Sequence, residues 1–416
     1  MSSSASSIGR APTRDDPLRG ASRGIAAALE RALAGHEPSF GDGLLLAECQ
    51  GADLDALISV ADHLRRETVG DIVTYVANRN INFTNVCFVG CEFCGFGRSA
   101  RAADAYTLSL EEIAAKAREA EALGATELCI QGGLPKDLDG YFYRDILRAV
   151  RAAAPELHIH AFSPMEIAYG AEKTGLSIRD FLQMLKDEGL NTIPGTAAEI
   201  LDDRIRAQVS PRKLPVALWV EIVTTAHRLG IRSSSTMMYG SVEEPADWVR
   251  HMLLLRRIQS DTGGFTEFVP LAFIHEQTRL YRRGRARGGA TGREHHLVHA
   301  LARALLHGAI PNVQVSWVKL GFPLALDCLN AGANDFSGTL MEESISKSAG
   351  ATFGEYVSPE EIRSMIRSIG RIPAERTTDY RIRQQFTLQT SEFVGIPPRL
   401  RVGQTQALAA HSHGGY

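Results

Sequence analysis

Helical and strand-like segments alternate along most of the chain. From residue 72 onward, amphipathic stretches that end in glycine are followed by short apolar or β-branched segments. Gly124, Gly189, Gly230 and Gly308 stand at such junctions, where glycine supplies the left-handed conformation that returns the chain to a sheet. The pattern predicts eight strands, near residues 73–82, 126–131, 157–162, 191–194, 231–238, 265–271, 313–318 and 333–336.

This alternation predicts the fold class. Strands that alternate with helices form parallel βαβ units. Eight units over about 270 residues fit an α/β fold of the (βα)8 TIM-like barrel type, closed or partly opened. A doubly wound sheet is the alternative, although the turn after the first strand carries cysteines and no Gly-x-Gly-x-x-Gly loop. We place the barrel over residues 71–345.

The segments on either side of the barrel have patterns of their own. Apolar residues recur at helical spacing within residues 21–70, which predicts an N-terminal helical segment. Residues 346–385 are predicted to be a C-terminal helical segment, with one helix over 357–370. Residues 1–20 and 386–416 show no such periodicity and are predicted to be tails.

Composition narrows the function classes. The chain is 44% hydrophobic and 22% charged, as in soluble globular proteins. Its net charge of -3 gives no basic footprint for nucleic acid, and no apolar run approaches the roughly 20 residues of a membrane span. The first residues lack the apolar core of a signal peptide. We therefore expect a cytoplasmic protein with reduced thiols, no nucleic-acid partner and no membrane partner.

Three cysteines carry the strongest chemical signal. They occur as Cys87-Phe-Val-Gly-Cys91-Glu-Phe-Cys94, directly after the first predicted strand and at the face where barrel enzymes place their chemistry. Three thiolates without a fourth ligand suit a 4Fe-4S cluster with one open iron. Zinc, which needs a fourth close ligand, and incidental cysteines are the alternatives. The other cysteines, Cys49, Cys129 and Cys328, are scattered and are predicted to be core thiols.

The triplet, with Phe93 before its third cysteine, resembles the radical S-adenosylmethionine (SAM) enzymes. The resemblance implies one 4Fe-4S cluster on Cys87, Cys91 and Cys94, whose open iron chelates SAM. It further implies SAM contacts at Phe93, at Gly132 and Gly133 after the second strand, and at Tyr239 and Glu243 after the fifth strand. A side chain at either glycine would crowd the methionyl group of SAM. A plain turn is the alternative explanation for the two glycines.

Further motifs narrow the resemblance to one subfamily. The stretch from Asn78 to Cys87 looks like the group that holds the deazaflavin (FO) synthases and the futalosine-pathway enzymes of menaquinone synthesis. The longer match, over roughly residues 45–380, is to the tyrosine-using subunit of FO synthase. Gly95 stands where that family more usually has alanine. The matching segments are HAFSPME (160–166), PGTAAEIL (194–201), STMMYG (235–240), TGGFTEFVPL (262–271), QVSWVKLG (314–321) and GANDFSGTLMEESIS (332–346).

What this resemblance implies is a transferase. Such an enzyme joins the 4-hydroxybenzyl group of L-tyrosine to 5-amino-6-(D-ribitylamino)uracil and releases 2-iminoacetate, 5'-deoxyadenosine and methionine. The product leads to FO and coenzyme F-420. Because the chain carries one cysteine triplet, ring closure is expected from a separate FO synthase subunit, and an electron donor such as flavodoxin or ferredoxin is expected. A futalosine-pathway enzyme and a non-catalytic iron–sulfur or zinc protein are the alternatives.

Polar residues at or after strand ends are candidates for substrate binding or catalysis, because such ligands need fixed hydrogen-bonding groups. Each could equally have a structural role. His160, which shares a strand face with His158, is a candidate base near the tyrosine amine or phenol. The candidates are His160, Glu166, Glu199, Glu267, Gln314, Asn334 and Asp335.

Overall fold

A computed structural model describes residues 17–388 of the chain. The predicted tails therefore lie largely outside the described residues. The strands are β1 (Ile72–Val76), β2 (Asn78–Asn82), β3 (Glu127–Gln131), β4 (His158–Ala161), β5 (Thr192–Ile193), β6 (Arg232–Tyr239), β7 (Phe265–Ala272), β8 (Asp335–Gly338), β9 (Ile372–Arg376) and β10 (Ile382–Gln385). The helices are α1 (Arg23–Leu33), α2 (Phe40–Glu48), α3 (Ala52–Val69), α4 (Leu110–Ala122), α5 (Phe142–Ala153), α6 (Pro164–Thr174), α7 (Ile178–Asp187), α8 (Asp203–Val209), α9 (Val216–Arg228), α10 (Pro245–Thr262), α11 (Arg279–Arg282), α12 (Gly292–Leu306), α13 (Trp317–Leu320), α14 (Phe322–Leu329), α15 (Ser344–Ala349) and α16 (Pro359–Ser368).

The strands close into a barrel. Parallel pairing joins β2, β3, β4, β5, β6 and β7 in that order. Two isolated bridges, Phe268–Val313 and Gln314–Asp335, carry the pairing from β7 to β8, and β8 pairs with β1. Because only Ala77 separates β1 from β2, the pairing runs once around the lumen. The predicted barrel is confirmed, and a doubly wound sheet is excluded.

Two predicted strands differ from the observed ones. The segment 73–82 is two strands, because its first half pairs with β8 and β9 whereas its second half pairs with β3. The segment 313–318 forms only the two bridges, since the chain turns into α13 at Trp317. In both cases the change is set by distant partners and is invisible in the local apolar pattern.

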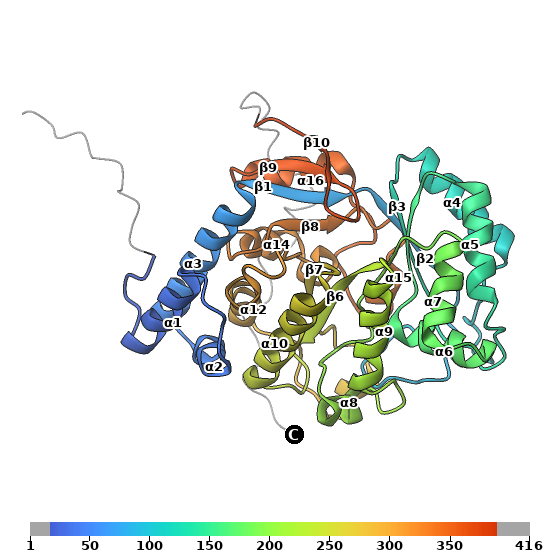
Figure 1. Cartoon of the computed structure of the whole chain (residues 1–416), viewed down its shortest axis with the longest axis horizontal. Helices are drawn as coiled ribbons and strands as arrows, with labels where there is room; N and C mark the ends of the chain where they lie inside the picture. The colour runs from blue at the N-terminus through green and yellow to red at the C-terminus, as the bar shows by residue number, and fades with distance from the viewer. Residues whose placement is uncertain (1–16, 389–416) are drawn as a thin grey trace, which may run out of the picture.

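The C-terminal segment ends in a β-hairpin, so the prediction of a helical segment over 346–385 is wrong beyond α16. Strand β9 pairs in parallel with the edge of β1, with Ile372 opposite Ile72, and β10 returns antiparallel to β9. Figure 1 shows this hairpin and α16 beside β1. The tip of the hairpin, residues 376–381, brings side chains to the end of the barrel at the N-termini of the strands, where they contact residues of β3 and β7.

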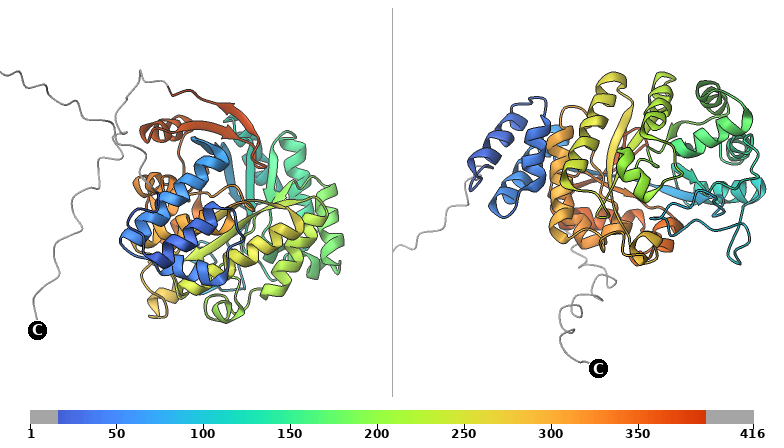
Figure 2. Two further views of the ribbon diagram at one scale, coloured as in Figure 1. Left: turned by 60° about the vertical axis from the view of Figure 1, so that its left-hand side comes forward. Right: turned by 90° about the horizontal axis from the view of Figure 1, so that it is seen from below.

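Helices α1, α2 and α3 occupy most of the segment predicted to be helical over 21–70. They lie together at one end of the molecule, against α10 and α12 (Figures 1 and 2). Their buried residues, which include Leu29, Leu57 and Leu64, belong to the same apolar cluster as the barrel. The N-terminal helices therefore extend the core outward and do not reach the lumen.

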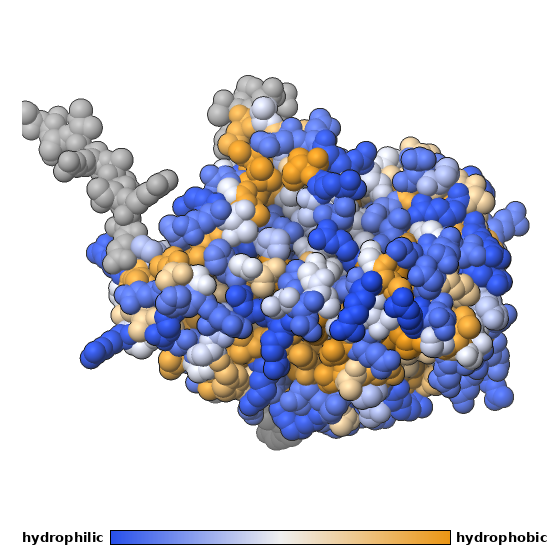
Figure 3. All heavy atoms as spheres, in the orientation of Figure 1, coloured by the Kyte–Doolittle hydropathy of each residue, from blue (hydrophilic) through white to orange (hydrophobic). Residues whose placement is uncertain are grey.

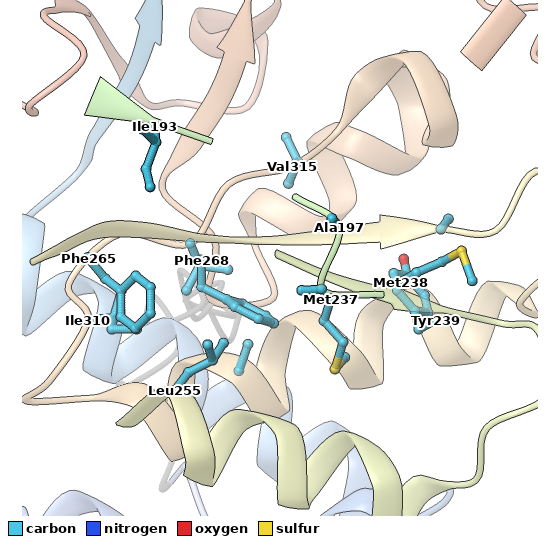
Figure 4. Packing of buried hydrophobic residues seen from close by; sticks show 14 of the residues in the cluster. Ile193, Ala197, Met237, Met238, Tyr239, Leu255, Phe265, Phe268, Ile310 and Val315 are labelled. Carbon is cyan, nitrogen blue, oxygen red and sulfur yellow. The ribbon is translucent and has the colours of Figure 1, made fainter. Parts of the chain in front are cut away.

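Alternation along the strands separates the lumen from the apolar layer. In β6, Thr236 and Met238 line the lumen, whereas Met237 and Tyr239 point to the opposite face. Figure 4 shows Met237 and Tyr239 among the buried residues of that layer, with Leu255 of α10 nearby. Full burial of a side chain such as Met237 contributes about 1.5–3 kcal/mol. The lumen is thus lined by both polar side chains, such as Thr236, and apolar ones, such as Met238.

The face drawn in Figure 3 shows mainly hydrophilic residues, with apolar residues among them. Over residues 17–388, every helix is too short or too polar to span a bilayer.

Candidate active site in the barrel lumen

A cavity of about 430 Å³ occupies the lumen. We call its end at the C-termini of the strands the mouth, and its end at the N-termini of the strands the floor. Glu127 on the floor precedes Gly132 at the mouth by five residues of β3 and its continuation, which corresponds to about 16 Å. The predicted site residues that line the cavity are Cys87, Cys91, Phe93, Cys94, Gly132, Gly133, His160, Glu166, Glu199, Glu267 and Gln314.

The cysteine loop follows β2 at the mouth. Cys91 is buried, whereas Cys87 and Cys94 are half-buried, and all three line the cavity. Burial raises the pKa of Cys91 to about 12, although the nearby ammonium of Lys213 opposes this shift. The amide of Gly97 donates to Sγ of Cys94 at 3.4 Å. The loop therefore presents three sulfurs to one space.

Glycines allow this loop to fold tightly. Gly90 adopts a φ of 62°, in the left-handed region. A Cβ at Gly95 would lie 2.5 Å from the carbonyl oxygen of Ser348 in α15. Glycine, in place of the more usual alanine, thus leaves the room that α15 needs to approach the cysteine loop.

The donor set suits a cluster better than a single ion. Among residues 17–388, no three His, Cys, Asp or Glu side chains converge on a point that could hold one metal ion. In a 4Fe-4S cluster each thiolate binds a different iron, so Cys87, Cys91 and Cys94 need to surround a common space without converging. Their shared position on the cavity wall fits this requirement.

Gly132 and Gly133 follow β3 directly beneath the cysteine loop. A Cβ at Gly132 would lie 2.6 Å from the ring of Phe83, and one at Gly133 would lie 2.2 Å from the carbonyl oxygen of Val86. Protein packing therefore already disfavours a side chain at either glycine, whether or not a cofactor binds there. Their carbonyl oxygens accept no hydrogen bond from any described residue, so both remain available to a ligand.

Glu166 connects the glycine pair to α6. Its carboxylate accepts from the amide of Gly132 at 2.9 Å and from the amide and hydroxyl of Ser163 at 2.7 and 2.6 Å. Burial raises the pKa of Glu166 to about 7, although these hydrogen bonds oppose the shift. The residue predicted as a substrate contact therefore also fixes the position of the Gly132 amide.

An ion pair borders the cysteine loop on its other side. Nζ of Lys213 lies 2.6 Å from Oε1 of Glu199, whose Oε2 lies 3.2 Å from Arg206. Nζ of Lys213 also lies 5.2 Å from the ring centroid of Phe93. Burial lowers the pKa of Lys213, but Glu199 and Cys91 outweigh it and raise the pKa overall. Lys213 was missed because it lies in a loop without periodicity or motif.

The floor is built around Arg376 from the tip of the C-terminal hairpin. Its Nε lies 2.5 Å from Oδ2 of Asp335, and its Nη2 lies 3.5 Å from Oε2 of Glu267. That same oxygen accepts from Gln314 at 3.0 Å and from the hydroxyl of Tyr380. Burial raises the pKa of Glu267 to about 7, although Arg376 opposes the shift. Asp335 is turned to Arg376 and does not line the cavity.

His160 and Glu127 complete the floor. Nδ1 of His160 and Nε2 of His158 lie 2.7 and 2.8 Å from the hydroxyl of Thr192. Burial lowers the pKa of His160 to about 4, although Glu127 opposes this, so the imidazole is neutral near pH 7. Glu127, which the sequence analysis missed, accepts from Thr378 at 2.7 Å.

Besides Asp335, three predicted site residues lie outside the cavity. Tyr239 follows Met238 and so points to the helix side of β6, where its hydroxyl lies 2.7 Å from Nδ1 of His295. Glu243 accepts from the amides of Ser241 and Val242, both at 3.0 Å, and holds the turn after β6. The structure thus gives neither Tyr239 nor Glu243 a side-chain path to a cofactor in the lumen.

Asn334 is the third of these residues. It precedes Asp335 and points away from the lumen, where its Oδ1 accepts from Arg303 at 2.7 Å and from the amide of Val313 at 2.9 Å. It fastens the short bridge segment to β8. Its role is therefore structural.

The prediction that the remaining cysteines are core thiols is wrong for Cys129. Cys49 and Cys328 are buried, but Cys129 lines the cavity, and Nε2 of Gln131 lies 3.6 Å from its sulfur. The reason is register, since Cys129 shares a face of β3 with Glu127.

Comparison with known proteins identifies the family. A model of the radical SAM superfamily matches residues 81–255, and a model of the CofH/MqnC C-terminal region matches residues 262–388. The 5-amino-6-(D-ribitylamino)uracil–L-tyrosine 4-hydroxyphenyl transferase of Methanocaldococcus jannaschii is 53% identical over 329 residues, which are 78% of this chain and 92% of that protein. The chain belongs to this transferase family of radical SAM proteins.

Other matches agree with this family. The FO synthase of Mycobacterium leprae is 54% identical over 340 residues, but the matched region is 82% of this chain and only 39% of that protein. The chain thus spans about two fifths of the FO synthases that it matches. Methylornithine synthase (TM-score 0.66, 16% identity, 83% of this chain and 97% of that one) and the hydrogenase maturase HydG of Carboxydothermus hydrogenoformans (0.67, 16%, 86% and 80%) share the fold. Membership of the radical SAM family implies a 4Fe-4S cluster and SAM.

Proposed function

We propose that the chain joins the 4-hydroxybenzyl group of L-tyrosine to 5-amino-6-(D-ribitylamino)uracil and releases 2-iminoacetate, 5'-deoxyadenosine and methionine, as a step toward FO and coenzyme F-420. The observation that carries this proposal is the 53% identity to the M. jannaschii transferase over 92% of its length. The relatives of 53–55% identity are named as this transferase or as FO synthases, which favours this function over a futalosine-pathway enzyme.

In this proposal the mouth of the barrel holds the cofactors. Cys87, Cys91 and Cys94 would hold the 4Fe-4S cluster, and the carbonyl oxygens of Gly132 and Gly133 would be available to the amine of SAM. When bound, these groups would supply radical chemistry for hydrogen abstraction. Phe93, whose ring centroid lies 5.2 Å from Nζ of Lys213, would contact SAM.

The rest of the cavity wall holds and shields the substrates. Apolar residues such as Met238, Leu271 and Leu340 exclude water from the lumen, which protects a reactive intermediate from side reactions. Glu166 holds the glycine pair in place. Neutral His160 supplies a hydrogen-bonding partner on the floor and is too weak a base to remain protonated near pH 7.

The proposal includes two functional partners in the cytoplasm, where thiols stay reduced. A flavodoxin or ferredoxin would deliver electrons to the cluster. A separate FO synthase subunit would close the deazaflavin ring, because one cysteine triplet supports one radical site in this chain.

An anaerobic reaction with tyrosine, the ribitylaminouracil, SAM and dithionite tests the proposal by mass spectrometry. We expect the tyrosine–uracil adduct, 2-iminoacetate and 5'-deoxyadenosine, and no fluorescence until the ring-closing subunit is added. Formation of 5'-deoxyadenosine without any adduct would refute the proposed substrates. Fluorescent deazaflavin from this chain alone would refute the division of labour.

A further inference from the structure

The floor of the cavity carries more hydrogen-bond acceptors than the protein's own donors satisfy. Glu267 and Asp335 share a single guanidinium, that of Arg376, whereas Glu127 accepts from the hydroxyl of Thr378, two residues further along the hairpin. Asp335 is satisfied by Arg376 and by Thr74, whose hydroxyl donates at 2.6 Å. The acceptors that face the cavity therefore belong to the other two carboxylates and to their neighbours on the lumen wall.

Three atoms on this floor have no partner. Among residues 17–388, no hydrogen bond reaches Oε1 of Glu267, Nε2 of His160 or Oε1 of Gln314. Glu267 is 7% exposed and His160 is 8% exposed, and both line the cavity. All three residues line the cavity, so a polar ligand bound there can reach these atoms.

The position and chemistry of the set select among the proposed substrates. Along β3, Glu127 lies about 16 Å from Gly132, and His160, which pairs in register with Cys129, lies about 10 Å from the level of Gly132. A ligand that reaches the floor therefore extends away from the glycine pair. A hydroxyl both donates and accepts, and therefore fits a carboxylate oxygen, an imidazole nitrogen and an amide oxygen together. A phenol offers one such group and an ammonium only donates, whereas a polyol chain offers several in a row.

We infer that the floor binds the ribityl chain of the uracil substrate, through Glu267, His160 and Gln314. The inference rests on the proposed function and adds the orientation of the second substrate. Arg376 and Thr378, from the hairpin tip, act as positioning residues because they hold Glu267 and Glu127 in place.

Competition between two ligands tests this inference. The ribitylaminouracil is the substrate, and 5,6-diaminouracil, which lacks the ribityl chain, serves as an inhibitor. In Glu267→Gln we expect the KM of the ribitylaminouracil to rise about tenfold, as for one lost hydrogen bond to a charged group. The inhibition constant of 5,6-diaminouracil and the KM of tyrosine should change less than about twofold. All three constants should also change less than about twofold in the control Glu221→Gln, on the exposed surface of α9.

A second variant and a binding measurement keep the test decisive. Gln314→Leu, of similar volume, should show the same pattern, and calorimetric binding of the ribitylaminouracil should weaken without any turnover. A rise in the KM of tyrosine alone, or equal losses for both uracils, would overturn the inference. Absence of adduct from the wild-type protein, with tight binding of the ribitylaminouracil retained, would refute the proposed function and leave the binding result standing.

A second inference concerns the outer surface of the mouth. The segment 279–287 lies against the cysteine loop, where Nη2 of Arg279 donates to the carbonyl oxygen of Gly90 at 2.6 Å and the amide of Leu280 donates to that of Glu92 at 2.8 Å. We define the basic patch as the exposed residues Arg212, Arg279, Arg282, Arg283 and Arg285.

The patch is strongly positive for a chain of net charge -3. Glu92 pairs with Arg283 at 3.2 Å and with Arg285, and Glu276 is the other carboxylate close to these arginines in sequence. Five arginines against these two carboxylates leave a surplus of positive charge. Because the patch contacts the loop of Cys91, a protein that docks there lies next to the predicted cluster.

We propose that the basic patch docks an acidic one-electron carrier protein that reduces the cluster. This proposal also rests on the proposed function, since only a redox cluster behind the loop requires such a partner. Complementary charge accelerates association by about ten- to a thousandfold at low salt, which suits a transient electron-transfer contact.

A comparison of two reductants, a carrier protein and dithionite, distinguishes an effect on docking from an effect on the chemical reaction. In Arg282→Glu/Arg283→Glu, which leaves Arg285 paired with Glu92, we expect the rate of 5'-deoxyadenosine formation with reduced flavodoxin to fall about tenfold or more at low salt. The rate with dithionite, which needs no docking surface, should stay within about twofold. The control Arg228→Glu/Arg257→Glu alters exposed arginines on α9 and α10 and should leave both rates unchanged. Equal losses with both reductants, or no loss with flavodoxin, would overturn the proposal.

Discussion

The mouth and the floor of the cavity are built in different ways. The mouth draws its key groups from two short stretches, residues 87–97 and 131–133, which follow adjacent strands β2 and β3. The floor takes Glu127, Glu267, Asp335 and Arg376 from β3, β7, β8 and the C-terminal hairpin. One end is thus a local motif, whereas the other exists only after the barrel has closed.

This difference has energetic consequences. The mouth is held by backbone geometry and tight glycine contacts, such as that of Gly133 with Val86. The floor is held by buried charges, in which one guanidinium faces Asp335 and Glu267. We therefore expect changes at the mouth to abolish chemistry and changes at the floor to alter stability and substrate selection.

Loss of one cysteine ligand should have the largest effect. Cys91→Ala should abolish iron–sulfur loading and 5'-deoxyadenosine formation, because each thiolate holds one iron. The control Cys129→Ala, on a residue that also lines the cavity, should retain the cluster. Iron analysis and the absorption of the reconstituted proteins check this, and full iron content in Cys91→Ala would contradict the assignment.

Loss of the floor cation should have the next largest effect. Arg376→Met should lower the free energy of unfolding by about 3–5 kcal/mol, because it leaves buried Asp335 and Glu267 without their partner. The control Arg148→Met breaks an exposed pair with Glu188 and should cost less than about 1 kcal/mol. Urea unfolding measures both, and similar small losses would show that the floor does not depend on Arg376.

The floor should also make stability depend on pH. Burial raises the pKa of Glu267 from 4.5 to about 7 in the folded protein. The folded state then binds more protons than the unfolded state between these values, so stability falls as pH rises through this window. Relative to Glu267→Gln, the free energy of unfolding of the wild type should fall by up to about 3 kcal/mol between pH 4.5 and pH 8. A flat difference across that range would argue against a buried acid.

The smallest effect is expected for Tyr239, which lies outside the cavity, and is best measured beside Gly133, which lines the mouth. Tyr239→Phe removes the hydrogen bond to His295 and should cost about 1 kcal/mol of stability, with the affinity for SAM unchanged. Gly133→Val, which would collide with the carbonyl of Val86, should weaken SAM binding with the cluster present. Isothermal titration measures the affinity of both variants for SAM. A tenfold loss of that affinity in Tyr239→Phe would show that Tyr239 contributes to the cofactor site.

The sequence could predict what depends on neighbouring residues. Period and glycine junctions locate the barrel, and the spacing of Cys87, Cys91 and Cys94 locates its mouth. Strand parity could also have placed the side chain of Tyr239 on the helix side of β6, since Thr236 and Met238 share the opposite face. The remaining errors in such predictions come from choosing the wrong residue of a motif as the one that faces the lumen.

The floor could be predicted only in part. Glu267 and Gln314 were found because they lie on strands, but Arg376 was placed in a helical segment and Glu127 was not considered. Each acquires its role from a partner far along the chain, as Thr378 does with Glu127. A pairing such as that of β9 with β1 leaves no local periodic signal in the sequence. Only the folded structure therefore shows it.

The central claim is that the mouth of the cavity generates the radical and the floor holds the second substrate. The ratio of adduct to 5'-deoxyadenosine tests this claim most directly. It should be measured anaerobically for the wild type, for Cys91→Ala and for Glu267→Gln with limiting ribitylaminouracil. The account predicts both products from the wild type, neither from Cys91→Ala, and 5'-deoxyadenosine with a reduced share of adduct from Glu267→Gln. An unchanged ratio in Glu267→Gln would contradict it, because the floor would then have no part in holding the second substrate.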